Sequence, residues 1–205
     1  MKTNMKITNK EELRALYGWP KGRAKTKVLT TLEKHSRHFI AHSPFFVMST
    51  YDNSGRSDAS PRGGKPGFVK ILDDHTLLIP DSKGNNRVDS LINIVETGSV
   101  GCLFLIPGID ETLRVNGTAI ITSNPEYIAM FPNERQPPKS CIKVSVSEMF
   151  LHCAKALMRS ELWANTYRQE RPGFPTLGKM LNDQLKIDAP LESQEEMVKR
   201  YREDL

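Results

Sequence analysis

The sequence predicts a mainly β protein: a barrel of roughly six or seven short antiparallel strands with peripheral helices. Short segments of apolar or alternating character recur at hairpin spacing, and turn-forming residues separate them. A continuous apolar run at residues 100–107 has the length of a buried strand. Regularly spaced short strands favour a closed or partly closed barrel, because closure removes unpaired edges.

Residues 1–44 are predicted to form a helical extension that packs on the barrel. The segment "TNKEELRALYG" has a capping residue near its start and a glycine at its end, which favours a short helix. Apolar residues then recur at helical spacing from Val28 through Leu32 to Phe39, and Pro44 ends this second predicted helix.

Residues 45–165 carry the strand signals and are predicted to form the barrel domain. The segments "FFVMSTYDNSGRSDASPRGG" and "GFVKILDDHTLLIP" each have the pattern of a strand, a turn and a strand. Further on, "SVGCLFLIPG" is continuously apolar, whereas "ETLRVNGTAIIT" and "CIKVSVSEMFLHC" alternate with the period of a strand. Residues 166–205 contain several prolines and end in a charged helix, and we expect a dimer arm or a lid there.

The composition indicates a soluble protein with a core of its own. The chain has 205 residues, of which 38% are apolar and 26% are charged. Its three cysteines form no CxxC pair, so a disulfide framework is not expected, and the N-terminus lacks an apolar signal core. The net charge of +5 is too mild to indicate nucleic-acid binding. We therefore expect a reduced, cytoplasmic protein that binds neither membrane nor nucleic acid.

Common catalytic and metal-binding motifs are missing from the sequence. It contains no Walker A loop, no G-x-G-x-x-G fingerprint and no H-E-x-x-H. His35, His38 and His42 could share one helix face, but a metal site usually needs a third or fourth ligand that converges from elsewhere in the chain. Surface histidines are the favoured interpretation, so we expect no metal, and we assign no catalytic acid or base.

The segment "SPRGGKPGF", which starts at Ser60, has two interpretations. It is either a basic surface turn or an anion site at the end of a strand. The planar guanidinium of Arg62 suits phosphate oxygens, and Gly63 with the following glycine would let a ligand approach the backbone closely. The residues alone leave both interpretations open.

The segment "IPDSKGNNR" combines cations with residues that expose the backbone. Lys83 and Arg87 enclose a glycine, Asn85 and Asn86 just where a helix is predicted to begin. The free N–H groups at a helix start, together with cations, favour phosphate binding. The alternative is ordinary capping of the helix by asparagine in a solvated loop. We favour the phosphate site.

Arg114 lies in a predicted strand, on the same face as Asn116. Such an arginine either points to solvent or lines a polar pocket, and the sequence pattern fits both.

In their order along the chain these segments resemble one family. "FIAHSPFFVMST", "SDASPRGGKPGFV", "LLIPDSKGNNRVDSLINI", "VGCLFLIPGIDETLRVNGTAII" and "FLHCAKALMRSELW" are together similar to the FMN-binding split-barrel proteins related to pyridoxamine 5'-phosphate oxidase. The similarity extends from about Phe39 to Trp163.

The resemblance implies a six-stranded antiparallel split β-barrel that forms a homodimer, with FMN at the subunit interface. It implies that FMN phosphate is held by Arg62 with its neighbours and by the loop of Lys83 to Arg87, and that Arg114 approaches the edge of the flavin ring. The residues so implied are Ser60, Arg62, Gly63, Lys83, Asn85, Asn86, Arg87, Arg114, Arg159 and Trp163.

The chain also departs from the pyridoxamine phosphate oxidases. It has "KGNNR" where they have an "SRK" loop, and their C-terminal Arg–His signature for substrate phosphate is absent. The resemblance therefore supports an FMN site in this chain better than it supports a pyridoxamine substrate. We expect an FMN-dependent oxidoreductase that acts with a small-molecule electron donor or substrate. The alternative is a flavin or haem carrier without turnover, with His152 as the residue to test for haem.

Overall fold

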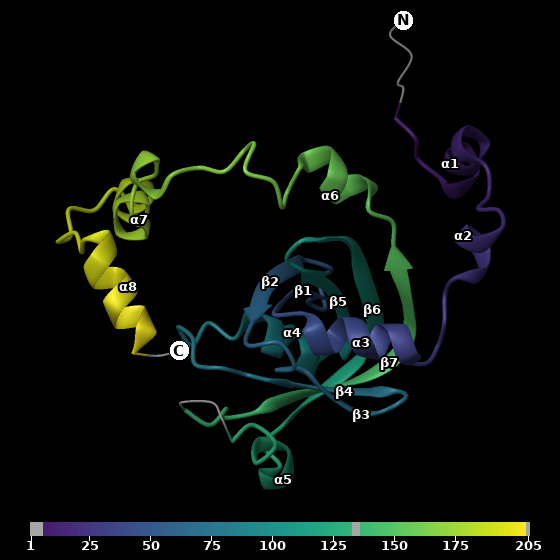
Figure 1. Cartoon of the computed structure of the whole chain (residues 1–205), viewed down its shortest axis with the longest axis horizontal. Helices are drawn as coiled ribbons and strands as arrows, with labels where there is room; N and C mark the ends of the chain where they lie inside the picture. The colour runs from purple at the N-terminus through teal and green to yellow at the C-terminus, as the bar shows by residue number, and fades with distance from the viewer. Residues whose placement is uncertain (1–5, 133–135, 204–205) are drawn as a thin grey trace, which may run out of the picture.

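Seven antiparallel strands form the centre of the protein, whose computed structural model describes residues 6–132 and 136–203. The strands are β1 (Phe45–Tyr51), β2 (Ser57–Gly63), β3 (Lys70–Asp73), β4 (Thr76–Pro80), β5 (Ser99–Ile106), β6 (Ile109–Thr122) and β7 (Cys141–His152). They pair in the order β2-β1-β5-β6-β7-β4-β3. The curved sheet and its surrounding helices are visible in Figure 1.

The core of the sheet follows from the alternation of apolar residues along the strands. Phe46 of β1 lies opposite Phe104 of β5, and their rings pack 4.9 Å apart. Leu113 of β6 and Val144 of β7 are also fully buried in this core. Side chains of alternate residues point to the same face, so each strand contributes one apolar row.

Gly117 allows the long strand β6 to bend against β7. The register of this pair shifts between Asn116 and Gly117. A Cβ atom on Gly117 would lie 2.0 Å from the carbonyl oxygen of Ser145, which no side chain can tolerate. The bend therefore requires glycine at this position.

Two helices pack on the sheet. Helix α3 (Lys34–His42) buries Phe39 and Ile40, and helix α4 (Asp89–Thr97) buries Ile94. Helix α3 begins later than its spacing predicts, because the Glu33 carboxylate accepts the backbone N–H groups of His35 and Ser36 and fixes the start there. The preceding segment is extended and pairs with β7 through Leu29 and Met149.

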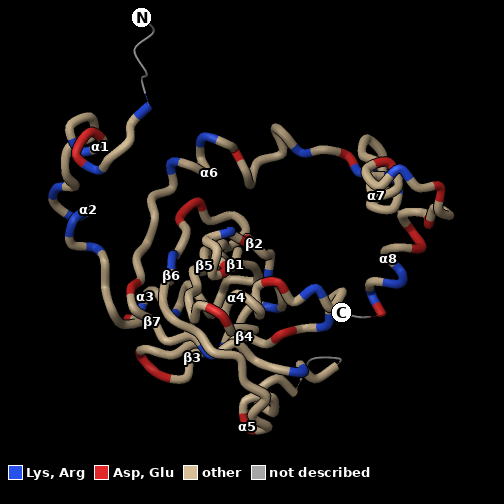
Figure 2. The backbone as a smooth tube through the Cα atoms, turned by 180° about the vertical axis from the view of Figure 1, so that it is seen from behind, with Lys and Arg blue, Asp and Glu red and all other residues tan. Residues whose placement is uncertain are grey.

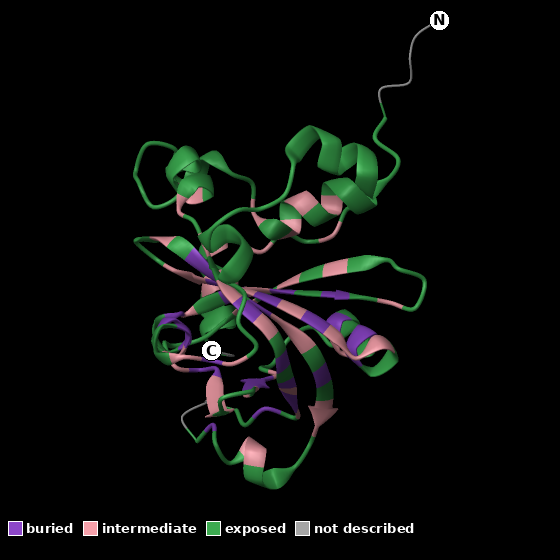
Figure 3. Cartoon of the chain, turned by 90° about the vertical axis from the view of Figure 1, so that its right-hand side faces the viewer, coloured by how far each residue is buried: buried purple, intermediate pink, exposed green. Residues whose placement is uncertain are grey.

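The remaining helices lie at the periphery. They are α1 (Lys10–Tyr17), α2 (Arg23–Thr26), α5 (Pro125–Ile128), α6 (Lys155–Ser160), the short 3-10 helix η1 (Arg171–Gly173), α7 (Leu177–Leu185) and α8 (Gln194–Arg202). None of these helices buries a residue. Figure 3 shows the peripheral helices as largely exposed, whereas buried residues gather on the strands and on the helices that pack against them. No helix among the described residues is long and apolar enough to cross a membrane.

The predicted fold class, a mainly β protein of antiparallel strands with peripheral helices, is confirmed. The sheet has seven strands, within the six or seven that the sequence pattern predicts and one more than the six that the resemblance implies. The edge strands β2 and β3 do not pair with each other, so the sheet is not closed. Each edge strand pairs on one side only, β2 with β1 and β3 with β4.

Candidate functional site

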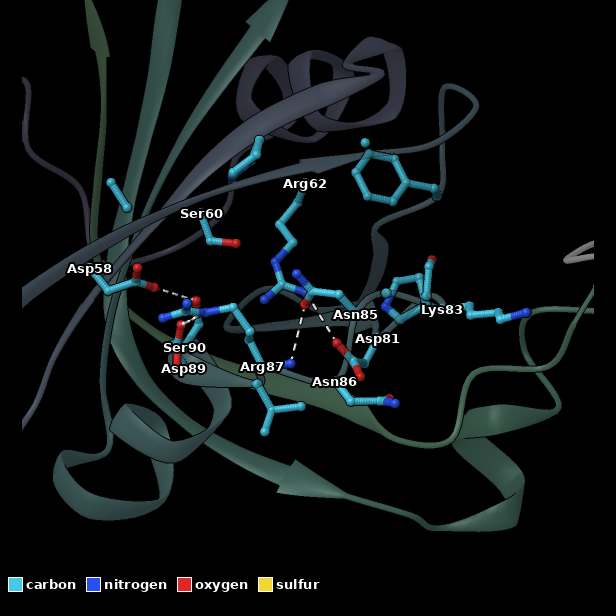
Figure 4. Close-up of a pocket in the computed structure, with 18 residues that line it drawn as sticks. Asp58, Ser60, Arg62, Asp81, Lys83, Asn85, Asn86, Arg87, Asp89 and Ser90 are labelled. Atoms are coloured by element: carbon cyan, nitrogen blue, oxygen red, sulfur yellow. Dashed lines mark hydrogen bonds and ion pairs between the residues drawn. The ribbon is translucent and has the colours of Figure 1, made fainter. Parts of the chain in front are cut away.

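A cavity of about 480 Å³ lies between β2, the end of β4 and the start of α4. We call it the β2 cavity. Seven of the residues predicted to bind the cofactor line it: Ser60, Arg62, Gly63, Lys83, Asn85, Asn86 and Arg87. They come from two segments that are separated in the sequence by β3 and β4. In Figure 4 the side chains of Arg62 and Arg87 come together from these two segments, whereas the side chain of Lys83 extends away from them.

Strand β2 presents one polar face to the cavity. Asp58, Ser60 and Arg62 alternate along the strand and are each half-buried. Arg62 Nη1 donates to Asp81 Oδ1 at 3.1 Å, and the side chains of this pair are 18% and 21% exposed. Arg62 Nε is buried and has no hydrogen-bond partner. A buried donor without a partner is costly, so this guanidinium can gain from an added acceptor.

Glycine and phenylalanine shape the wall next to Arg62. A Cβ on Gly64 would lie 2.7 Å from Cγ of Phe68, which itself lines the cavity. A glycine is therefore needed for Phe68 to pack against the strand end. The cavity thus has an apolar side as well as its cationic side.

The loop before α4 differs from its prediction. The asparagines do not cap the helix: α4 begins at Asp89 and its N-cap is Val88, with no side-chain cap. Asn85 Oδ1 accepts the backbone N–H of Arg87 at 3.2 Å. Asn86 and Val88 both have left-handed backbone, with φ of 61° and 49°. Such a conformation in a β-branched residue costs on the order of 1–3 kcal/mol, and strain of this kind gathers at functional sites.

The two arginines of the β2 cavity each contact a carboxylate, Arg62 that of Asp81 and Arg87 that of Asp89. Arg87 Nε donates to Asp89 Oδ2 at 2.8 Å, and this contact raises the pKa of Arg87 above its ordinary value. Asp58 accepts a hydrogen bond of 2.6 Å from the Ser90 hydroxyl. The lining therefore carries three cations, Arg62, Lys83 and Arg87, and three carboxylates, Asp58, Asp81 and Asp89. An incoming anion would exchange with carboxylates already in place.

The carboxylates were missed by the sequence reasoning. One signal was present: Asp58 stands two residues before Ser60 and four before Arg62, so strand alternation places all three on one face. The contact between Arg62 and Asp81 had no such signal, because it joins the end of β2 to the end of β4.

Three predicted residues do not line the β2 cavity. Arg114 is exposed on β6, and its guanidinium lies 5.3 Å from the ring centroid of Phe150. Trp163 Nε1 donates to the carbonyl oxygen of Ile109 at 2.9 Å. Arg159 is exposed in the last turn of α6.

His152 lies at the end of β7, next to Phe150, with ring centroids 5.1 Å apart. Its Nε2 is buried without a hydrogen-bond partner. Burial lowers the pKa of His152, and the nearby cations Arg114 and Lys27 lower it further. Among the described residues, no three histidine, cysteine, aspartate or glutamate side chains are grouped as a metal site would require.

The family model described as pyridoxamine 5'-phosphate oxidase matches residues 32–153, more than half of the chain. No curated protein matches the chain.

Several solved structures are similar to this chain. A HupZ variant from Group A Streptococcus superposes with a TM-score of 0.50 at 18% identity, covering 59% of this chain and 99% of its own. A protein of Lactobacillus delbrueckii solved as a candidate pyridoxamine 5'-phosphate oxidase has a TM-score of 0.46 at 17% identity, covering 60% and 95%. For HutZ, the haem storage protein of Vibrio cholerae, the TM-score is 0.42 at 15% identity, covering 59% and 93%. At its low identity the HupZ likeness shows a common fold alone. From the family match and its antiparallel sheet, this chain belongs to the pyridoxamine 5'-phosphate oxidase family.

Proposed function

We propose that this protein is an FMN-binding flavoprotein that holds the FMN phosphate in the β2 cavity. One observation carries the proposal. Residues of β2 and of the loop before α4, both expected to bind phosphate, meet in one cavity, and there Arg62 has a buried N–H without a partner. A cavity of about 480 Å³ lies within the usual size of small-ligand sites, roughly 300–1,000 Å³.

The donors of the cavity fit a phosphate group. Arg62 and Arg87 offer charged N–H groups, the two asparagines offer neutral N–H groups, and Ser60 offers a hydroxyl. A hydrogen bond to a charged group contributes about 1.5–3 kcal/mol net. Three or four of them would supply the roughly 8 kcal/mol of a micromolar ligand. Asp81 and Asp89 already form ion pairs with the two guanidinium groups. Displacing these carboxylates would offset part of the binding free energy.

Bound FMN would supply hydride or electron transfer, and the chain would bind, orient and shield it. We propose an oxidoreductase that uses a small-molecule donor, and a homodimer in which the ring extends toward the second subunit. Arg114, Arg159 and Trp163 do not line the β2 cavity of their own chain. They would contact the ring end of FMN, which the phosphate site of one chain leaves open.

The visible spectrum of the purified protein tests the proposal. We expect a flavin spectrum, either as purified or after incubation with FMN. A colourless protein that takes up no FMN would refute it. Anaerobic mixing with NADH or NADPH then tests turnover, because bleaching with either cofactor supports an oxidoreductase, whereas none with both points to a carrier.

Arg87→Ala is the site test for the loop. Arg87 lies in the β2 cavity, so its loss should weaken FMN binding roughly tenfold while riboflavin, which lacks phosphate, binds nearly as before. Fluorescence titration with both ligands measures the difference. Equal loss for both would show that Arg87 does not contact the phosphate.

Haem binding is a second candidate, favoured by His152. Its unpartnered Nε2 and its lowered pKa keep the imidazole neutral, the form that coordinates iron. A Soret band that forms with added haem and disappears in His152→Ala would select this function over flavin binding.

A further inference from the structure

The N-terminal arm, residues 6–27, carries the positive charge of the protein. It contains seven lysines or arginines and two glutamates, a net charge of +5 that equals the charge of the whole chain. Figure 2 shows the blue segments of this arm around α1 and α2, away from the sheet. The arm is therefore a concentrated cationic segment on a protein that is otherwise nearly neutral.

No residue of the N-terminal arm is buried. Its aromatic side chains are open to solvent: Tyr17 is 75% exposed and Trp19 is 72% exposed. Among the described residues, Lys21, Arg23 and Lys25 form no ion pair. Helix α1 has eight residues, fewer than a helix needs to be stable in water without packing. These features indicate that the arm folds against another surface.

A groove of about 590 Å³ next to α4 has the complementary character. We call it the α4 groove. Its lining includes four carboxylates, Asp52, Asp58, Asp89 and Glu96, but only two cations, Arg56 and Arg87. The groove therefore has a net negative charge.

Helix α4 and its N-cap Val88 carry an apolar stripe beside this groove. Val88, Ile92 and Val95 stand at helical positions i, i+4 and i+7, and all three are exposed. Ile92 lines the groove itself, and Val95 is 74% exposed. An exposed apolar stripe with an acidic rim is the surface that a basic, aromatic segment would cover.

We propose that the N-terminal arm of one copy binds the α4 groove of a second copy. Trp19 would pack against Ile92 and Val95, and the unpaired arm cations would face Glu96 and its acidic neighbours. Both surfaces occur once in every chain, so a two-fold dimer forms the contact twice. Tryptophan and arginine are the residues that most often dominate such interfaces.

The net charge favours the N-terminal arm over the C-terminal residues as the segment that binds the α4 groove. Residues 166–203 also expose apolar side chains, but they hold seven lysines or arginines and seven aspartates or glutamates. They have no net attraction to an acidic groove. This contact between copies does not require flavin. A partner arm in the α4 groove would nevertheless lie next to the β2 cavity, because Asp58, Arg87 and Asp89 line both.

Disulfide trapping between differently tagged chains tests the contact. One chain carries Trp19→Cys and the other Val95→Cys, both with Cys153→Ser, because Cys153 is the exposed native cysteine and the other two are buried. We expect a cross-link between the two tags under mild oxidation. The matched control is Ile120→Cys, an apolar position on β6 that is 60% exposed. No cross-link with Val95→Cys, or an equal yield with Ile120→Cys, would overturn the proposal.

Charge exchange gives an independent measurement on the full chain. Glu96→Lys should weaken dimerisation about tenfold in analytical ultracentrifugation, and Arg23→Glu together with Lys25→Glu should restore part of it. Trp19 fluorescence, recorded with Trp163→Phe, should shift to the red on dilution of the dimer. A Trp19 signal that stays solvent-like in the dimer and shifts only with anionic vesicles or nucleic acid would refute the second copy as the partner.

Discussion

Two sites in the molecule each contain a buried nitrogen without a hydrogen-bond partner: Arg62 Nε in the β2 cavity and His152 Nε2 at the end of β7. Among the described residues these are the two side-chain atoms of this kind. Their surroundings are opposite in sign. Arg62 faces Asp81, whereas His152 lies near the cations Arg114 and Lys27.

This difference decides what each site can do. At the β2 cavity a fixed cation is held by a carboxylate that an anionic ligand can replace, so the site suits phosphate. At His152 burial and two cations disfavour a third positive charge, so the imidazole stays neutral. A buried nitrogen without a partner thus favours anion binding at Arg62, whereas at His152 it accompanies a neutral imidazole.

The largest expected effect comes from removing the cation of the first site. Arg62→Ala should weaken FMN binding by about 1.5–3 kcal/mol, roughly 10- to 100-fold, because a charged donor to the phosphate is lost. Riboflavin affinity should change little. Titration of flavin fluorescence gives both constants, and a thermal unfolding curve checks that the variant is folded.

Arg114→Ala is the matched control for this comparison. Arg114 does not line the β2 cavity, so the ratio of FMN to riboflavin affinity should stay near that of the parent protein. If the two arginine variants lose the same phosphate preference, the β2 cavity is not the phosphate site.

A substitution at Asp81 is expected to change FMN affinity less than Arg62→Ala does, and in the opposite direction. Asp81→Asn removes the carboxylate that competes for Arg62, so FMN should bind several-fold more tightly. Isothermal titration at low and moderate salt measures the gain. Weaker binding would mean that Asp81 orients Arg62 for the phosphate, and that displacement of Asp81 does not limit the affinity for FMN.

At the second site the neighbouring charge should set the pKa of His152. Arg114→Gln removes one of the cations that lower this pKa, so the pKa should move upward toward about 6.5, the ordinary value of histidine. Titration of the imidazole by NMR follows the shift. No movement would leave burial and Lys27 as the effective causes.

The smallest effect is on stability as a function of pH. Because the pKa of His152 is lowered in the folded chain, the unfolded chain binds more protons as pH falls through about 6.5. Folding stability is therefore reduced below that pH and recovers above it. In His152→Asn the decline measured by urea unfolding between about pH 7 and 5 should be shallower, and an unchanged decline would contradict the assignment.

Much of this protein could be predicted from the sequence, because the signals are local. Alternation with a period of two identified the strands around Val115 and Val144, and turn residues located the hairpins. Arg62 and the loop from Lys83 to Arg87 were candidates because cations with glycine and asparagine suit an anion. The order of these segments indicated the family, which the match over residues 32–153 confirms.

Tertiary structure decided the features that depend on distant parts of the chain. The pairing of β4 with β7 joins distant segments, and the edge strands β2 and β3 stay apart, so the sheet is left open in a way that no local pattern specifies. Helix α4 begins at Asp89, after Val88, whose left-handed backbone no local pattern predicts because β-branched residues rarely adopt it. Arg62 meets Asp81 only where the ends of β2 and β4 approach, and only folding buries Nε2 of His152 and brings two cations near its ring. The sequence by itself determined which side chains were available to the site, whereas the packed chain determined their partners, burial and charge balance, since these are properties of distances in space.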